Sequence, residues 1–209
     1  SIACSGVSVE GFTFRNPPRN IGITANNVTS CFIKENIFTS NYFGIRLSFC
    51  VNSTVINNTA MDNRVGVLLE SSPNSTVGGN TVYSNLYNGI LVKNSSFCVV
   101  CDNDVAWSNY GIRIENSNKC EIENNVVEKT IYYGLQACLS NGSKVNNNTV
   151  SENYSVGVSV QNSMNCTITQ SVLRNNSNYG LRIYSSDGCQ AVENVVDHNY
   201  HGVWLEHSN

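Results

Sequence analysis

The sequence predicts an all-β protein, a parallel β-helix (β-solenoid) of about nine coils without obvious end caps. Three observations predict this fold. A glycine-led signature recurs at a fixed step, apolar and polar residues alternate within short segments, and columns of Asn and of Ser or Cys accompany them. Self-similarity at a fixed period is typical of repeat proteins, whose units bury their apolar faces only by stacking on one another.

The glycine-led signature, Gly-apolar-x-apolar, sets the repeat. Regular copies follow one another at steps of 22 or 23 residues, and no linker interrupts them, so residues 1–209 are predicted to form a single β-helix domain. The copies begin near Gly22, Gly44, Gly66, Gly89, Gly111, Gly134, Gly157, Gly180 and Gly202. We expect each glycine to mark a bend that needs a positive φ.

Short strands are predicted after each glycine. Apolar residues occupy alternate positions, as in Gly111-Ile112-Arg113-Ile114, and two further apolar columns follow a polar corner. This period of two is that of a half-buried strand, whereas no ten-residue segment carries a helical pattern. Arg46, Arg113 and Arg182 stand between the first two apolar columns, where we expect side chains to point outward.

Two polar columns complete each repeat. Asn tolerates left-handed backbone angles, and stacked Asn side chains can hydrogen-bond from one coil to the next. The Asn column contains Asn36, Asn58, Asn80, Asn103, Asn125, Asn148 and Asn194, with Ser171 as an exception. The second column lies five residues earlier and contains Cys31, Ser53, Ser75, Cys98, Cys120, Ser143, Cys166 and Cys189.

The repeats resemble those of a known family. The pattern Gly-apolar-x-Leu, followed by Thr-Val-x-x-Asn, runs through Gly44 to Asn58 and Gly66 to Asn80. It is similar to the right-handed parallel β-helix repeats of NosD-type periplasmic copper-binding proteins. Similar repeats occur in carbohydrate-binding proteins, in sugar hydrolases, and in archaeal surface-layer and sheath proteins. With its columns of Cys and Asn, this sequence most closely resembles the surface-layer and sheath proteins. The resemblance implies a right-handed β-helix but brings no copper ligands to these positions, because the shared residues are those that build coils.

Composition excludes several classes of protein. Charged residues are 13% of the chain and the net charge is −3, which argues against a nucleic-acid partner. No apolar run approaches the roughly 18 residues of a membrane span. We expect no cofactor, because no phosphate-binding loop and no zinc-type arrangement of two Cys-x-x-Cys pairs is present.

No catalytic residue is predicted, since the sequence contains no Ser-His-Asp set. One acidic cluster is a weak candidate for a calcium or catalytic site, because adjacent coils would bring its oxygen ligands together. It consists of Asp102, Asp104, Glu121 and Glu123, and we favour their interpretation as solvated surface acids. His198, His201 and His207 are likewise interpreted as surface or interface residues.

Nine cysteines are many for a chain of this size. In-register neighbours would have Cα atoms about 4.8 Å apart, within the disulfide window of roughly 4.4 to 6.8 Å. Cys98 with Cys120, and Cys166 with Cys189, are therefore candidate disulfides, although we favour a ladder of buried thiols. The remaining candidates for interchain thiols are Cys4, Cys50, Cys101 and Cys138.

Two further patterns concern glycans. Ten Asn-x-Ser/Thr sequons start at Asn27, Asn52, Asn57, Asn74, Asn94, Asn141, Asn147, Asn153, Asn165 and Asn175. Chance alone gives about six in this composition, so the sequons support glycosylation only weakly. Tyrosines near the glycine corner can stack on sugars or on each other; they are Tyr42, Tyr87, Tyr110, Tyr133, Tyr154, Tyr179 and Tyr200.

The predicted function follows from the two ends of the stack. Cys4 and Ser208 fall in the same corner of the coil, so a second molecule could continue the stack almost in register. We therefore expect an extracellular structural protein that stacks end to end with itself into a cell-surface filament, hoop or sheath. The alternatives are a carbohydrate-binding or polysaccharide-cleaving domain with a groove along one face, and a periplasmic copper-binding protein.

Overall fold

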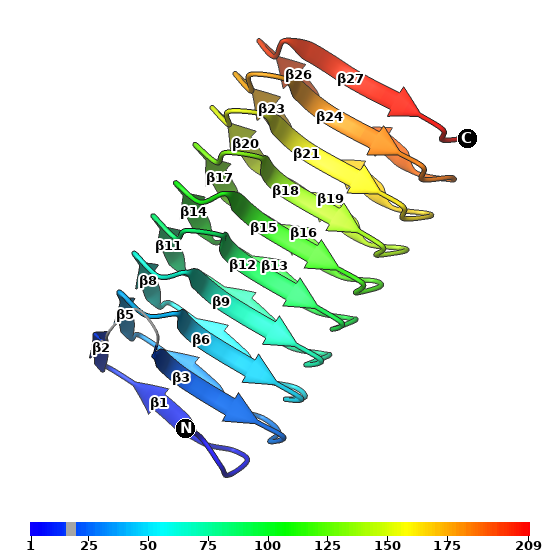
Figure 1. Cartoon of the computed structure of the whole chain (residues 1–209). Coiled ribbons are helices and arrows are strands. Elements are labelled where there is room, and N and C mark those ends of the chain that lie inside the picture. Colours follow the sequence, from blue (N-terminus) through cyan, green and yellow to red (C-terminus); the bar gives the residue numbers. More distant parts are fainter. Residues whose placement is uncertain (16–19) are drawn as a thin grey trace.

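A computed structural model describes residues 1–15 and 20–209, which form a β-helix of nine coils (Figure 1). Each coil contributes one strand to each of three parallel nine-stranded sheets, so the predicted fold and repeat are confirmed. Sheet A contains the six-residue strands β3 (Ile21–Asn26), β6 (Phe43–Ser48), β9 (Val65–Glu70), β12 (Asn88–Lys93), β15 (Tyr110–Glu115), β18 (Tyr133–Cys138), β21 (Val156–Gln161), β24 (Tyr179–Tyr184) and β27 (His201–Glu206).

The other two sheets are built from three-residue strands. Sheet B contains β1 (Ser8–Glu10), β4 (Phe32–Lys34), β7 (Thr54–Ile56), β10 (Thr76–Gly78), β13 (Val99–Cys101), β16 (Glu121–Glu123), β19 (Lys144–Asn146), β22 (Thr167–Thr169) and β25 (Gln190–Val192). Sheet C contains β2 (Thr13–Arg15), β5 (Ile37–Thr39), β8 (Thr59–Met61), β11 (Thr81–Tyr83), β14 (Asp104–Ala106), β17 (Val126–Glu128), β20 (Thr149–Ser151), β23 (Val172–Arg174) and β26 (Val195–Asp197).

The core is the inside of the helix. The four apolar columns point inward and stack coil on coil, and Ile112, Ile114, Ile122 and Val127 of one coil are each 0% exposed. A single coil leaves its apolar side chains open above and below, so the core exists only through stacking. Among the described residues there is no helix of the length and hydropathy that crossing a membrane requires.

The coils turn at residues with left-handed backbone angles. In the coil that begins at Gly111 these corners are Asn116, Lys119, Asn124 and Lys129, with φ between 48° and 57°. The residue after each corner is buried, and its backbone N–H donates to a side-chain oxygen in the next coil. The bonds are Ser117 to Ser140 (3.1 Å), Cys120 to Ser143 (3.3 Å), Asn125 to Asn148 (3.0 Å) and Thr130 to Asn153 (3.0 Å).

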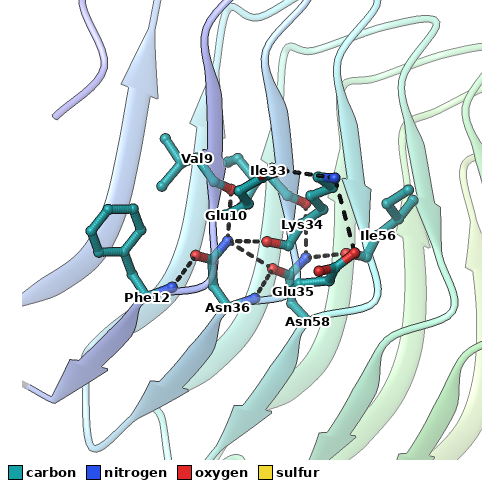
Figure 2. A network of polar contacts seen from close by, with 9 residues as sticks. All are labelled: Val9, Glu10, Phe12, Ile33, Lys34, Glu35, Asn36, Ile56 and Asn58. Carbon is teal, nitrogen blue, oxygen red and sulfur yellow. Dashed lines mark hydrogen bonds and ion pairs between the residues drawn. The ribbon is translucent and has the colours of Figure 1, made fainter.

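The Asn column forms the predicted hydrogen-bonded ladder. Figure 2 shows its first members, where the Asn36 amide nitrogen donates to the carbonyl of Val9 (2.9 Å) and to Oδ1 of Asn58 (3.1 Å). The amide oxygen of Asn36 accepts the backbone N–H of Phe12 at 3.0 Å. The left-handed angle, however, belongs to the preceding residue, Glu35, and not to the ladder Asn.

The repeat glycines occur where predicted, but the prediction that they need a positive φ is wrong. None of the nine repeat glycines has a positive φ; they are Gly22, Gly44, Gly66, Gly89, Gly111, Gly134, Gly157, Gly180 and Gly202. In every copy before Gly202 a side chain would point inward into filled space: a Cβ on Gly66 would lie 2.6 Å from the carbonyl oxygen of Gly89 and 2.8 Å from Cγ1 of Val82. The glycine therefore permits close packing of coil on coil, not an unusual backbone angle.

Candidate functional site

The outer face of sheet A is the broadest surface of the molecule that regular strands present. Because residues between the inward columns point out, neighbouring coils align their outer side chains into columns. One column along the strand start reads Phe43, Val65, Asn88, Tyr110, Tyr133, Val156, Tyr179 and His201. The next reads Arg46, Leu68, Leu91, Arg113, Gln136, Ser159, Arg182 and Trp204.

Aromatic rings and arginines line five successive coils where sheet C turns into sheet A. We define the aromatic strip as Tyr42, Phe43, Arg64, Tyr87, Tyr110, Arg113, Tyr132 and Tyr133. The ring of Tyr110 stacks on Tyr133 with centroids 5.8 Å apart and contacts Tyr132 at 5.4 Å. The guanidinium of Arg113 lies over the Tyr110 ring at 5.0 Å. The tyrosines thus contact each other and arginines while keeping exposed surface, which reaches 39% for Tyr87 and 48% for Tyr132.

The charges of this face are paired, with one exception. The arginines of the outward column contact carboxylates one column along: Arg46 to Glu70 at 2.9 Å, Arg113 to Glu115 at 3.1 Å and Arg182 to Glu206 at 3.9 Å. Lys93 shares Glu115 at 3.6 Å. Across the described residues no carboxylate forms an ion pair with Arg64.

Unsatisfied polar atoms gather on the same face. In the described part of the chain, five buried side-chain atoms have no hydrogen-bond partner: Nε of Arg64, Arg113 and Arg182, Oδ1 of Asn88 and Oε1 of Gln136. All five belong to sheet A strands or to the residue just before one. Buried polar groups are normally paired, and an unpaired group marks a place where a ligand or water completes the bonding.

The four acidic candidates do not assemble into one site. Asp104 lies in sheet C, in a cavity with Tyr83, Trp107 and Glu128, whereas Glu121 and Glu123 lie in sheet B. Glu121 forms an ion pair with Lys144 at 2.8 Å. Asp102 is exposed at a corner between those two sheets. The expectation that adjacent coils bring all four within reach of one another is therefore wrong, because the corner sends Asp104 onto another face.

A second, polar groove lies on sheet B. Its cavity of about 310 Å³ is lined by Glu121, Ile122, Glu123, Lys144, Asn146, Thr167 and Thr169. Its residues offer hydrogen bonds but no aromatic ring, and Lys144 is neutralised by Glu121. For a ligand that needs apolar contact, this groove therefore suits less well than the outer face of sheet A.

The histidines lie on the surface, as expected. His198 contacts Asp197 at 2.7 Å, and His201 stacks on Tyr179 with ring centroids 5.0 Å apart. His207 approaches Glu206 at 3.8 Å. No set of three or more His, Cys, Asp or Glu side chains in residues 1–15 and 20–209 is arranged to hold a metal ion.

The column cysteines form the expected ladder of thiols. All nine cysteines are free thiols in the structure. Cys98 and Cys120 lie next to each other, and their thiols donate to the carbonyls of Ser72 (3.5 Å) and Ser95 (3.4 Å). Burial raises the pKa of Cys166 to about 11, with its neighbour Cys189 contributing. The two disulfides remain predictions.

The interchain-thiol candidates need one correction. Cys50 is fully buried, and its thiol donates to the carbonyl of Ser48 at 3.2 Å, so it is not available to another chain. Cys4 is exposed, and Cys101 and Cys138 are half-buried. Burial, helped by Asp102 and Glu123, raises the pKa of Cys101 to about 11, so that thiol stays protonated at neutral pH.

The coil architecture accounts for many of the sequons. In Asn57-Asn58-Thr59 the first residue is a left-handed corner, the second a ladder residue and the third the start of a strand. Asn is favoured at the corner and Thr in the strand, so the structural preferences of the coil alone can produce an Asn-x-Thr motif, without any role for a glycan. Nine of the ten candidate asparagines are exposed. Asn153 is buried and its amide donates to Asn176 at 2.8 Å, which removes it from the accessible sequons.

Sequence reasoning missed two features. One is a second polar ladder after the sheet C strands, with members such as Asn41, Asn63, Asn85, Asn153, Asn176 and Asn199. The regular spacing of these asparagines was a signal that could have found it. The other is Arg64, which falls outside the apolar columns and stands out only once the coils are stacked.

Comparison with known proteins identifies the family. A family model described as "Right handed beta helix region" matches residues 2–142, and one described as "Periplasmic copper-binding protein (NosD)" matches residues 84–209. No curated protein matches the sequence significantly. Copper is implied by the second description, but the described residues do not fit it, since they provide no cluster of metal ligands.

Solved structures show the same fold at low identity. The A-module of mannuronan C-5 epimerase AlgE4 from Azotobacter vinelandii superimposes with a TM-score of 0.82 at 14% identity, covering 90% of this chain and 63% of that one. The periplasmic alginate epimerase AlgG gives 0.76 at 18% identity, covering 87% and 50%. The Streptococcus pneumoniae surface protein and adhesin PfbA gives 0.74 at 12% identity, covering 98% and 67%.

The chain spans half to less than two thirds of the epimerase chains that it matches, and at these identities the likeness shows the fold alone. The two family models each cover more than half of the chain and together cover residues 2–209. Their descriptions confirm the predicted right-handed winding of the coils. The chain belongs to the NosD-type family of right-handed β-helix proteins.

Proposed function

We propose that this protein binds carbohydrate along the outer face of sheet A. The observation that carries the proposal is the coincidence, on one face, of the aromatic strip with all five buried and unpartnered polar side-chain atoms. Tyrosine rings provide flat apolar contact together with a polar tip, which suits a ligand with apolar faces and a hydroxyl-rich rim. Unpaired donors and acceptors beside those rings supply sites for the hydroxyls.

The spacing of the fold suits an elongated ligand. Each coil repeats the same strand about 4.8 Å from the last, so a chain lying across the strands meets a similar set of side chains at each step. Tyr110 and Tyr133 on successive coils show this repetition directly. The epimerases among the structural neighbours act on polysaccharide by name, which supports the same class of ligand here. We infer a location outside the cytoplasm, because the family is described as periplasmic.

Replacing both Tyr110 and Tyr133 by alanine tests the proposal. The measurement is binding of the purified protein to an array of neutral and acidic glycans, followed by titration of the best ligand. We expect the double variant to bind at least about tenfold more weakly, since each ring supplies stacking contact worth roughly a kcal/mol. Tyr83→Ala is the matched control, because Tyr83 lies on sheet C. Equal binding by both variants and the wild type would contradict the proposal.

End-to-end stacking is the second candidate function. It is favoured by the three parallel sheets, in which the strands of each coil pair with those of the next in register. A second copy that paired with β27 would cover Val203 and Leu205, which are 52% and 64% exposed. Val203→Lys together with Leu205→Lys should then keep the protein monomeric at concentrations where the wild type associates, as sedimentation velocity would report. A wild type that stays monomeric at millimolar concentration would remove this candidate.

Catalysis on polysaccharide is the enzymatic alternative to plain binding. Asp102, one of the four acidic candidates, lies at an exposed corner between sheets B and C, away from the aromatic strip. Lyase or epimerase activity on a uronic-acid polymer that disappears in Asp102→Ala would support this alternative. The geometry of sheet A supports binding without it.

A further inference from the structure

We infer that Arg64 forms a subsite for the carboxylate of an acidic sugar, so that the carbohydrate bound on sheet A is a uronic-acid polymer. The inference rests on the proposed function and names its ligand class. Arg64 lies just before β9, and its guanidinium is placed between the rings of Tyr42 and Tyr87, at 4.8 and 4.6 Å from their centroids. The two rings hold the cation in one place between neighbouring coils.

The bonding of Arg64 is incomplete. A guanidinium carries five N–H groups, and within residues 1–15 and 20–209 this one donates a single hydrogen bond, from Nη2 to the hydroxyl of Tyr87 at 2.7 Å. Its Nε is buried without a partner. The other four described cations of the face, Arg46, Lys93, Arg113 and Arg182, each form an ion pair with Glu70, Glu115 or Glu206, and Lys93 and Arg113 share Glu115. Among the described residues Arg64 is therefore the cation of this face without an ion pair, and a planar carboxylate from outside matches its geometry.

A cavity opens beside this arginine. It has a volume of about 350 Å³, within the range of small-molecule sites, and is lined by Ser40, Asn41, Asp62, Asn63, Arg64 and Leu86. Asp62 is exposed and does not pair with Arg64. A simple anion gains nothing from Asp62, whereas a sugar acid presents hydroxyl donors to Asp62 and its carboxylate to Arg64. The combination of cation, acceptor and flanking rings thus favours a uronate over phosphate or sulfate.

Affinity measurements with three polymers test the inference: polygalacturonate for the carboxylate, dextran as the neutral polymer and dextran sulfate as the sulfated one. We expect polygalacturonate to bind best, and Arg64→Gln to bind it about tenfold to hundredfold more weakly, since the variant loses a charge-assisted bond. Arg64→Lys should recover part of the affinity, because it restores the charge but not the planar fork.

The control is Arg174→Gln. Arg174, like Arg64, has no ion pair in the described structure, but it is exposed and lies in β23 of sheet C. Arg174→Gln removes the same charge from the molecule as Arg64→Gln, but it does so away from the sheet A face. We therefore expect it to leave polygalacturonate binding unchanged. Circular dichroism melting of the three variants shows whether each keeps the fold.

The outcomes separate this inference from the proposed function. Equal weakening by Arg64→Gln and Arg174→Gln would show a net-charge effect and overturn the subsite. Binding of dextran as strong as that of polygalacturonate, lost in the Tyr110 and Tyr133 variant, would overturn the uronate but keep the sheet A surface. Preference for dextran sulfate over polygalacturonate would likewise overturn the carboxylate assignment. No binding to any polymer would contradict both.

Discussion

Single residues decide how closely the coils pack. The repeat glycines before Gly202 lie where a Cβ would point inward against the next coil, and where a corner is followed by Ser or Asn, that side-chain oxygen accepts a backbone N–H of the preceding coil. The close packing at glycine and the hydrogen bond after the corner both join residues about 23 positions apart, so neither can be predicted from the local sequence. Sequence reasoning found the glycines by their period but assigned them a positive φ, because a bend is the commoner reason for glycine.

Gly111→Ala should destabilise the protein by about 1 to 3 kcal/mol, the usual cost of overpacking a filled core. Its Cβ would meet Cγ1 of Val127 and lie 2.5 Å from the carbonyl oxygen of Gly134. Gly202→Ala is the matched control, since its nearest atom would be Cγ1 of Val196 at 3.9 Å. Urea unfolding followed by circular dichroism measures both. If the two variants unfold at the same urea concentration, the steric explanation of the glycine column is wrong.

Asn103→Ala should cost about 1 to 3 kcal/mol of stability, because it leaves buried groups without partners. Oδ1 of Asn103 accepts the backbone N–H and the side-chain amide of Asn80 at 3.0 and 2.9 Å, and its amide donates to the carbonyl of Val77 at 3.0 Å. Asn103→Ser should recover part of the loss, as Ser171 fills the same column. Asn124→Gly changes an exposed left-handed corner and should stay within about 0.5 kcal/mol of the wild type.

Cysteine titration should weaken the fold only at alkaline pH. Burial raises the pKa of Cys166 to about 11 from its ordinary 9.0, so the unfolded chain loses this proton first as pH rises. The stability from this group is therefore constant below pH 9 and declines between about pH 9 and 11. The measurement is the difference in unfolding free energy between wild type and Cys166→Ser, both reduced, from pH 7 to 10.5. A difference that already changes between pH 6 and 8 would contradict the assignment.

At the scale of the element, the three strands of a coil differ in how well the sequence predicts them. The sheet A strands follow a glycine and alternate over six residues, so their position and inward columns were predictable. The strands of sheets B and C are only three residues long, each with one inward apolar residue, as in Glu121-Ile122-Glu123. The sequence therefore located their apolar columns, but it could not show that Asp104 and Glu121 turn onto different faces, because that depends on the corner between them.

The coil is the unit that can be removed. Deleting residues 112–134 joins Gly111 to Leu135 and takes out one coil while keeping every column in register. We expect a folded protein that melts cooperatively a few degrees lower, since repeat proteins lose one repeat and one interface. Deleting residues 112–122 removes about half a coil and should prevent folding, because each later apolar column would face the wrong sheet. Circular dichroism melting compares the two; equal stability of both would contradict the coil assignment.

For the whole molecule, the repeat period and the columns of apolar and polar residues determine the fold. The candidate binding site on sheet A depends instead on how neighbouring coils align. The sequence predicted nine stacked coils, the Asn ladder and outward arginines, and all are present. It also indicated tyrosines near the glycine corner, but it left open whether they face sugars or one another. The aromatic strip combines residues from five coils, so Arg64 between Tyr42 and Tyr87 appears only in three dimensions.

The most direct test of the sheet A surface is amide hydrogen exchange of the intact protein, with and without polygalacturonate. We expect slower exchange confined to β9, β12, β15 and β18 and to the corners just before them, in wild type but not in the Tyr110→Ala, Tyr133→Ala double variant. Protection centred on the sheet B groove of Glu121, Lys144 and Thr167 instead, or no protection anywhere, would contradict it.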